Sequence, residues 1–300
     1  MKTPWRIHLY LILSNLIYGA SFTIGKEIVP GYMGPYGLIL IRITITAIMF
    51  FIMQLFYVKE KIERKDWLLL SLCALFGLSI NQLLFFKGLA MTTPISAALV
   101  STSTPILVIL LAAMYQEESL GWKKISGILI GAVGASLIIT VGKNLKLTDG
   151  TFLGDLLILA NSASYAVYLV IVKPLMKKYQ PLTIITWMFF IGWVFVVPVG
   201  WGEFKEINWQ AITPLIWWAI IFIILFTTFF SYLLNILALK NTSSSIVGIY
   251  IYAQPIFATI FAILWGKDHL NWQNILASIL IFIGVYLVSF TKQNSQPANT

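Results

Sequence analysis

Long apolar stretches separated by short polar segments run along the whole chain. We find ten stretches of about 20 residues, the length at which a helix crosses the hydrocarbon core of a bilayer. They cover residues 8–27, 35–57, 67–88, 94–115, 123–142, 153–173, 182–200, 214–238, 244–265 and 272–290. About ten residues remain for each connection, too few for a folded domain outside the membrane. The pattern predicts an all-α integral membrane protein with ten transmembrane helices.

The composition supports this interpretation. Hydrophobic residues make up 59% of the chain and charged residues 10%, whereas a soluble domain carries about 25% charged residues. The first stretch follows Lys2 and Arg6 as in a signal peptide, but no small-x-small cleavage site follows it, so we expect a retained helix. The single cysteine, Cys73, lies among leucines, which predicts a buried thiol and excludes a disulfide within the chain.

The net charge of +9 is explained by membrane topology. If the N-terminus is placed in the cytoplasm, the inner segments hold 13 Lys and Arg residues and the outer segments hold 6, while Arg42 lies within a span. This bias favours two cytoplasmic termini in a bacterial cytoplasmic (inner) membrane. The lipid bilayer is then the expected surroundings, and no nucleic-acid partner is needed to account for the basic charge.

One phrase occurs twice. The stretch "TSTPILVILLAAMYQEESLGWKKISGILIGAVGA" at 102–135 aligns without a gap to "YAQPIFATIFAILWGKDHLNWQNILASILIFIGV" at 252–285, matching Pro105 to Pro255. Tyr18 and Lys26 correspond less strictly to Tyr165 and Lys173, at an offset of 147 residues. Because each half holds an odd number of spans, we expect two inverted five-helix repeats, at 1–145 and 146–300. Inverted repeats are typical of transporters that work by alternating access.

These copies resemble a known family. Both "GLAMTTPISAALVSTSTPILVILLAAMYQEE" and "LALKNTSSSIVGIYIYAQPIFATIFAILWGKDHLNWQNILASILIFIGVYLVSF" are similar to the EamA-like family of the drug/metabolite transporter superfamily. The resemblance covers essentially the whole chain, including the arginine of "LIRITI". It implies ten helices in two inverted repeats, cytoplasmic termini, and export or exchange of small metabolites, with amino acids as the first candidates.

The prolines of the repeated phrase indicate a site at the membrane midplane. Each of Pro105 and Pro255 lies 11 residues into its span and should free the carbonyl four residues earlier, on Ser101 or Ile251. A free carbonyl is tolerated in a membrane only beside polar groups or a water-filled cavity. Matching helix breaks in two repeats therefore indicate a binding site. The alternative is a kink that only shapes helix packing.

Polar residues at helical spacing on other spans predict which helices face a shared cavity. Phe22 and Asn235 extend two of these stripes. Buried amides and phenols are costly in hydrocarbon and should point to the bundle interior, although each could serve only as a hydrogen bond between helices. The predicted substrate cavity comprises Asn15, Tyr18, Asn81, Gln82, Ser101, Thr104, Asn161, Tyr165, Tyr168, Thr228, Ser231, Tyr232, Tyr252 and Gln254.

Arg42 is the cation within a span, seven residues after Pro35 and so about 10 Å from the start of its helix. We favour either snorkelling to the outer surface or a pair with Glu27. Contact with an anionic group of the substrate is the alternative.

The remaining motifs favour transport over catalysis. His8 and His269 are far apart, the chain has no zincin spacing and no cysteine cluster, and it lacks an ATP-binding Gly-Lys-Ser/Thr loop, so we expect no metal, no cofactor and no enzymatic activity. Gly127 and Gly131 form a small-x-x-x-small pattern that fits helix packing and leaves a homodimer open.

The sequence thus predicts a secondary transporter that exports a small metabolite such as an amino acid. The alternatives are an uptake carrier for a carboxylated or nucleotide-derived metabolite, and a membrane scaffold that transports nothing.

Overall fold

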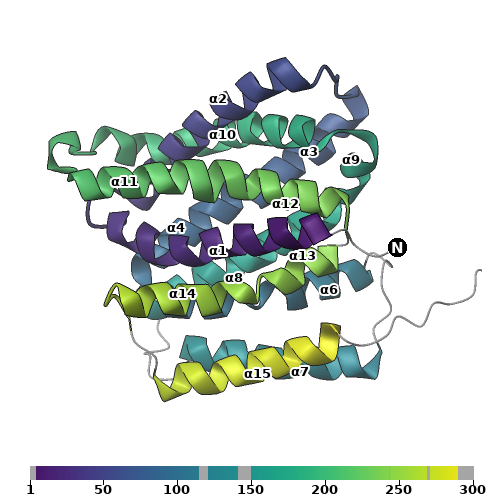
Figure 1. The fold of residues 1–300 in the computed structure, drawn as a ribbon, viewed down its shortest axis with the longest axis vertical. Coiled ribbons are helices and arrows are strands. Elements are labelled where there is room, and N and C mark those ends of the chain that lie inside the picture. Colours follow the sequence, from purple (N-terminus) through teal and green to yellow (C-terminus); the bar gives the residue numbers. More distant parts are fainter. Residues whose placement is uncertain (1–4, 115–120, 141–149, 243, 269–270, 290–300) are drawn as a thin grey trace, which may run out of the picture.

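A computed structural model describes residues 5–114, 121–140, 150–242, 244–268 and 271–289, and within these ranges the chain is helical with no strand (Figure 1). Eight of its helices are long and apolar enough to cross a membrane. Shorter apolar helices lie at Ile125–Gly134 and Ile275–Gly284. The prediction of an all-α, multi-pass membrane protein is therefore confirmed, while the count of ten and the division at residue 145 stay predictions.

The two halves of the chain contain a similar series of helical elements, apart from the short α9 in the second half, and the third and fourth spans of the first half are each interrupted. The first half comprises α1 (Trp5–Ile28), α2 (Pro35–Tyr57), the 3₁₀ turn η1 (Arg64–Asp66), α3 (Trp67–Ala74), the π-helix η2 (Leu75–Ser79), α4 (Ile80–Met91), α5 (Pro94–Ser101), α6 (Thr104–Met114) and α7 (Trp122–Thr140).

The second half repeats both interruptions. It comprises α8 (Gly150–Ile171), α9 (Lys173–Lys178), α10 (Pro181–Lys205), the 3₁₀ turn η3 (Trp209–Ala211), α11 (Pro214–Phe222), the π-helix η4 (Ile223–Phe230), α12 (Ser231–Lys240), α13 (Ser244–Tyr250), α14 (Ala253–Leu264) and α15 (Trp272–Ser289).

Each π-helix is stabilised in the same way by a hydroxyl. A π-turn widens the helix, so the ordinary backbone ladder is disturbed there. Ser79 Oγ donates to the Ala74 carbonyl at 3.3 Å in η2, and Thr228 Oγ1 donates to the Ile223 carbonyl at 2.7 Å in η4. In both cases the hydroxyl reaches five residues back and pairs a carbonyl that hydrocarbon could not solvate.

A lysine from the first span of each half caps the end of the third span. Lys26 Nζ donates to the carbonyls of Leu89 and Ala90, both at 2.9 Å. Lys173 Nζ donates to the carbonyl of Leu239 at 3.0 Å and to that of Thr242 at 2.6 Å. The last carbonyls of a helix lack backbone donors and carry partial negative charge, so an ammonium group stabilises them. The weak correspondence of the two lysines in sequence is thus matched by the same structural role.

The helices form a flat stack in which related helices pair (Figure 1). α2 packs against α10 at one edge and α7 against α15 at the other, and the spans between these pairs form the middle. The start of α1 and the end of α15 lie at the same end of the helices (Figure 1). The broken and π-containing spans therefore lie in the interior of the stack.

Glycines bring α7 and α15 into backbone contact. A Cβ atom added at Gly284 would lie 2.5 Å from the Gly127 carbonyl oxygen, and one added at Gly134 would lie 2.9 Å from that of Ala277. The small-residue pattern of α7 is therefore used for packing within the chain, and a homodimer stays a prediction that this contact does not address.

We expect Gly284→Leu to destabilise the protein by more than about 3 kcal/mol, because its side chain cannot fit unless two packed helices separate. Gly202→Ala is the matched control: no atom lies within 4 Å of the added Cβ, and alanine favours a helix by about 1 kcal/mol. Thermal unfolding of the purified protein in detergent measures both. Equal unfolding temperatures for the two variants would contradict this packing.

Candidate functional site

The fourth and ninth predicted spans are broken at corresponding places. α5 ends at Ser101 and α6 begins at Thr104, while α13 ends at Tyr250 and α14 begins at Ala253. Thr102 N donates to the Leu99 carbonyl at 3.1 Å, and Gln254 N donates to the Ile251 carbonyl at 2.9 Å, both over three residues. The expectation that Ile251 has a free carbonyl is therefore wrong, because the chain tightens into a 3₁₀-type turn that uses it.

The two breaks lie against each other. α5 packs on α14 and α6 packs on α13, so the halves of one broken helix meet the halves of the other. At the crossing, an added Cβ on Gly248 would lie 3.5 Å from Cβ of Pro105. Interrupted backbone is therefore kept inside the protein, away from lipid.

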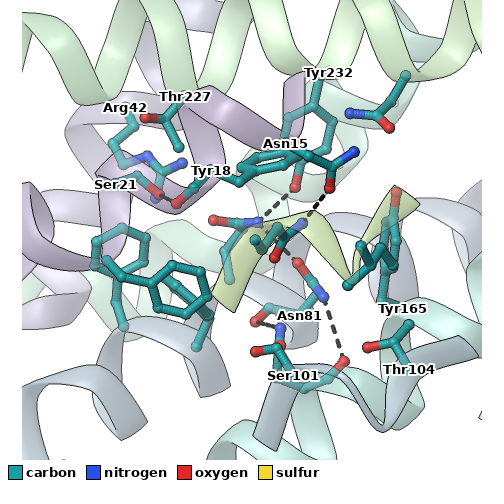
Figure 2. A pocket seen from close by; sticks show the side chains of 18 residues that line it. Asn15, Tyr18, Ser21, Arg42, Asn81, Ser101, Thr104, Tyr165, Thr227 and Tyr232 are labelled. Carbon is teal, nitrogen blue, oxygen red and sulfur yellow. Dashed lines mark hydrogen bonds between the residues drawn. The ribbon is translucent and has the colours of Figure 1, made fainter. Parts of the chain in front are cut away.

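A cavity of about 90 Å³ lies beside the crossing and has room for a few water molecules (Figure 2). Its lining comes from both halves of the chain. Of the predicted cavity residues, the structure places around it Asn15, Tyr18, Asn81, Gln82, Ser101, Thr104, Asn161, Tyr165, Tyr232 and Gln254.

Corresponding positions of the two halves line this cavity together. Ser101 and Thr104 match Ile251 and Gln254 at an offset of 150 residues, as Gln82 matches Tyr232. Gln82 Nε2 donates to Tyr232 Oη at 2.6 Å, so two matching residues meet directly. The cavity therefore lies where the two halves face one another.

Amide side chains connect the wall. Gln254 Nε2 donates to Asn15 Oδ1 at 2.7 Å, and Asn161 Nδ2 donates to the Asn81 carbonyl at 2.7 Å. Gln82 Nε2 also lies 2.8 Å from Asn81 Oδ1. Amides both donate and accept, so this wall can match neutral polar groups of either kind.

Two predicted cavity residues belong to other packing. Tyr168 is 5% exposed, and its ring covers Gly77, where an added Cβ would lie 2.5 Å away. Tyr252 is 8% exposed, and its ring centroid lies 6.3 Å from that of Phe282 on α15. Neither belongs to the residues placed around this cavity, because Tyr252 packs toward α15 and Tyr168 covers Gly77 in the π-turn. Their part in a substrate site stays a prediction.

Thr228 and Ser231 are also absent from the lining of this cavity. Both are fully buried. Thr228 is used by the π-helix and by Arg42, and the Ser231 hydroxyl has no hydrogen-bond partner within the described part of the chain. A strictly α-helical register places Thr228 on the face of Tyr232 and Asn235, whereas the wider turn of η4 brings Thr227 to that face instead.

The cavity contains residues that sequence reasoning missed. Phe22 and Asn235, which extend two of the polar stripes found in the sequence, do line the cavity. The missed residues are Ser21, Phe85, Phe86, Thr227 and Ile251. A phenylalanine or isoleucine in a membrane helix carries no signal that separates cavity from lipid, and Thr227 is placed by the π-turn.

Arg42 lies in the cavity wall, and both interpretations that the sequence favoured are wrong. Its side chain is only 1% exposed, so it does not snorkel, and Glu27 pairs instead with Lys267 at 2.8 Å. Arg42 Nε and Nη2 donate to Thr228 Oγ1 at 2.9 and 2.7 Å. Its Cζ lies 4.5 Å from the ring centroid of Phe86, a cation–π contact.

Metal binding has no support in the described ranges, where no three His, Cys, Asp or Glu side chains gather into a site. The cavity wall is instead made of amides, phenols, hydroxyls, aromatic rings and one guanidinium group. Such a wall binds by hydrogen bonds, stacking and one charge.

Comparison with known proteins agrees with this architecture. The model of the EamA-like transporter family matches residues 5–140 and again residues 152–290. The chain belongs to the EamA-like transporter family. It is therefore a multi-pass membrane protein of a transporter family, built from two repeats.

Relatives of this family member carry transporter names. A protein of Archaeoglobus fulgidus named "Uncharacterized transporter" is 26% identical, over 95% of this chain and 97% of its own. A "Probable terminal-alkyne amino-acid exporter" of Streptantibioticus cattleyicolor is 26% identical over 63% of this chain and 62% of its own. A crystal structure of another protein, at 18% identity, shares the fold with a TM-score of 0.66 over 94% of this chain and 96% of that one.

We expect Gln254→Leu to slow transport by about tenfold or more, since it leaves Asn15 without its partner in the cavity. Tyr252→Phe is the neighbouring control: its ring packs on α15 and its hydroxyl is not part of the wall. Transport rates at matched protein levels in the membrane test both. Loss of transport in Tyr252→Phe with normal transport in Gln254→Leu would contradict the site.

Proposed function

We propose that this protein is a secondary transporter that exports a small polar metabolite across a bacterial cytoplasmic membrane by alternating access. Its ten helices would form two inverted repeats with both termini in the cytoplasm. The observation that carries this proposal is the central cavity, walled by matching positions of the two halves beside two matching helix breaks. Such a site can be exposed to either side when one half rocks against the other.

Amino acids are our first candidates for the substrate. The amide-rich wall suits a small polar solute, and one relative is named as an amino-acid exporter. Purified protein in liposomes loaded with radiolabelled amino acids tests the proposal, since no partner protein is present. Release of the radiolabel that is faster than from equally loaded liposomes without protein supports the proposal. A protein that moves no small metabolite in either direction would be a scaffold.

The topology predicts which loops face the cytoplasm. Residues 58–63 carry Lys59 and Lys61 and lie at the opposite end of the helices from residues 206–213 (Figure 1). A reporter enzyme that works only outside the cytoplasm should be silent when inserted at 58–63 and active at 206–213. The reverse result would mean that the protein has the opposite orientation in the membrane. The same result at both loops would contradict an odd number of membrane crossings between them.

The prolines should act on the transport cycle. Pro105→Ala and Pro255→Ala each restore a backbone donor at a break and so favour a straighter helix. Because we expect the repeats to be inverted, the two changes should shift the equilibrium between inward-open and outward-open states in opposite directions, by about 2- to 10-fold.

Labelling of a single cysteine measures this shift. Ser21→Cys places a thiol in the cavity wall, and a Cys73→Ala background removes the buried native thiol. A membrane-impermeant maleimide added outside should label one proline variant faster and the other more slowly than the parent. Changes in the same direction would show that the breaks shape packing without controlling access.

A further inference from the structure

Arg42 is a buried cation without a counter-ion. No acidic side chain in the described ranges pairs with it, and Thr228 Oγ1 and the Phe86 ring are neutral partners. These contacts orient the guanidinium group but do not neutralise it. A charge held within a membrane protein is costly, and where it persists it usually pairs with another charge or faces a cavity. Arg42 faces the cavity (Figure 2).

The donors that remain point to a ligand. Arg42 Nη1 is buried and has no hydrogen-bond partner among the residues that the structure describes, and the same holds for the hydroxyl of Thr227, which is 3% exposed. Both residues line the same cavity (Figure 2). Buried donors left without partners destabilise a protein and call for a bound group or water.

The matching position of the second half carries no charge. The second span of each half begins with a proline, and seven residues after Pro181 the second half has Met188, where the first half has Arg42 after Pro35. The π-helix hydroxyl of the first half, Ser79 Oγ, likewise contacts the second span of the other half, through the Gly192 carbonyl at 3.2 Å. The contact of Ser79 with α10 corresponds to that of Thr228 with Arg42 on α2, and it involves no charged side chain.

We propose that Arg42 Nη1 and the Thr227 hydroxyl form a subsite for one carboxylate group of the transported molecule. The subsite deepens the proposed function and rests on it. One guanidinium balances one negative charge, and Arg42 is the sole Lys or Arg among the residues placed around the cavity. A phosphate group, with up to two charges, would remain unbalanced there. The amides and phenols of the wall are left for the neutral part of the molecule.

Matched ligands test the subsite by binding alone. We would measure the unfolding temperature of the detergent-solubilised protein against concentration for L-amino acids, small hydroxy acids, their primary amides and inorganic phosphate. The acid should bind at least about tenfold more tightly than its amide, because the amide lacks the charge that Arg42 needs. Equal binding of acid and amide, tighter binding of phosphate, or no response to any carboxylate would overturn the proposal.

Variants assign the effect to these two side chains. Arg42→Gln should reduce the preference for acid over amide to within about threefold, and Thr227→Val should weaken binding of the acid by about tenfold. Thr227→Val should fold normally, since its hydroxyl has no partner to lose. Thr183→Val is the matched control, because that hydroxyl is equally buried and unpartnered but lies away from the cavity. Unchanged binding in Thr227→Val, or equal losses in both threonine variants, would overturn the proposal.

Failure of the subsite differs from failure of the transporter. A carboxylate that binds with the expected dependence on Arg42 but is never moved across liposomes would keep the subsite and remove transport. A substrate without a carboxylate that is moved across liposomes, with a rate unchanged in Thr227→Val, would keep transport and remove the subsite.

Discussion

Hydrocarbon cannot hydrogen-bond, and this one constraint governs where the chain may depart from a regular helix. The π-turns and the two helix breaks lie in the interior, and each has hydrogen-bond partners. The π-turns use Ser79 and Thr228 hydroxyls, the breaks use 3₁₀-type backbone bonds, and the ends of α4 and α12 use Lys26 and Lys173. The outer pairs α2–α10 and α7–α15 contain no such interruption. Irregular backbone and polar side chains therefore gather in the same place, and the cavity follows from that gathering.

Repetition explains why both halves of the chain contribute to the cavity wall. The π-turn and the helix break of one half occur again in the other, so the polar residues near them lie around one cavity. The bond between Gln82 and Tyr232 is the clearest case, since the two residues occupy matching positions. Departures from the repeat are then informative, and Arg42 is the largest of them, with a charge where the other half has a methionine.

The sequence predicted the class of fold and much of the cavity for a physical reason. Polar residues are so costly in hydrocarbon that those on the spans should point inward, and Asn15, Gln82, Asn161 and Gln254 do lie around the cavity. The pattern could not reveal the π-helices, because one extra residue in a turn leaves no mark in composition. The sequence therefore did not show that Thr227, and not Thr228, faces the cavity. The sequence also did not show that Arg42 is buried. From the same position on a helix, a long side chain can extend either to the lipid headgroups or into an interior cavity.

The composition of the cavity wall also bears on the source of energy for transport. Amides, hydroxyls, phenols and a guanidinium group do not change charge between about pH 5 and 8, and no carboxylate or imidazole belongs to the residues placed around the cavity. The buried carboxylate of Asp155 lies outside that wall, where it accepts hydrogen bonds from Thr92 and Ser96. In the proposed transporter, a proton gradient would therefore act through the charge state of the cargo or through groups outside this wall.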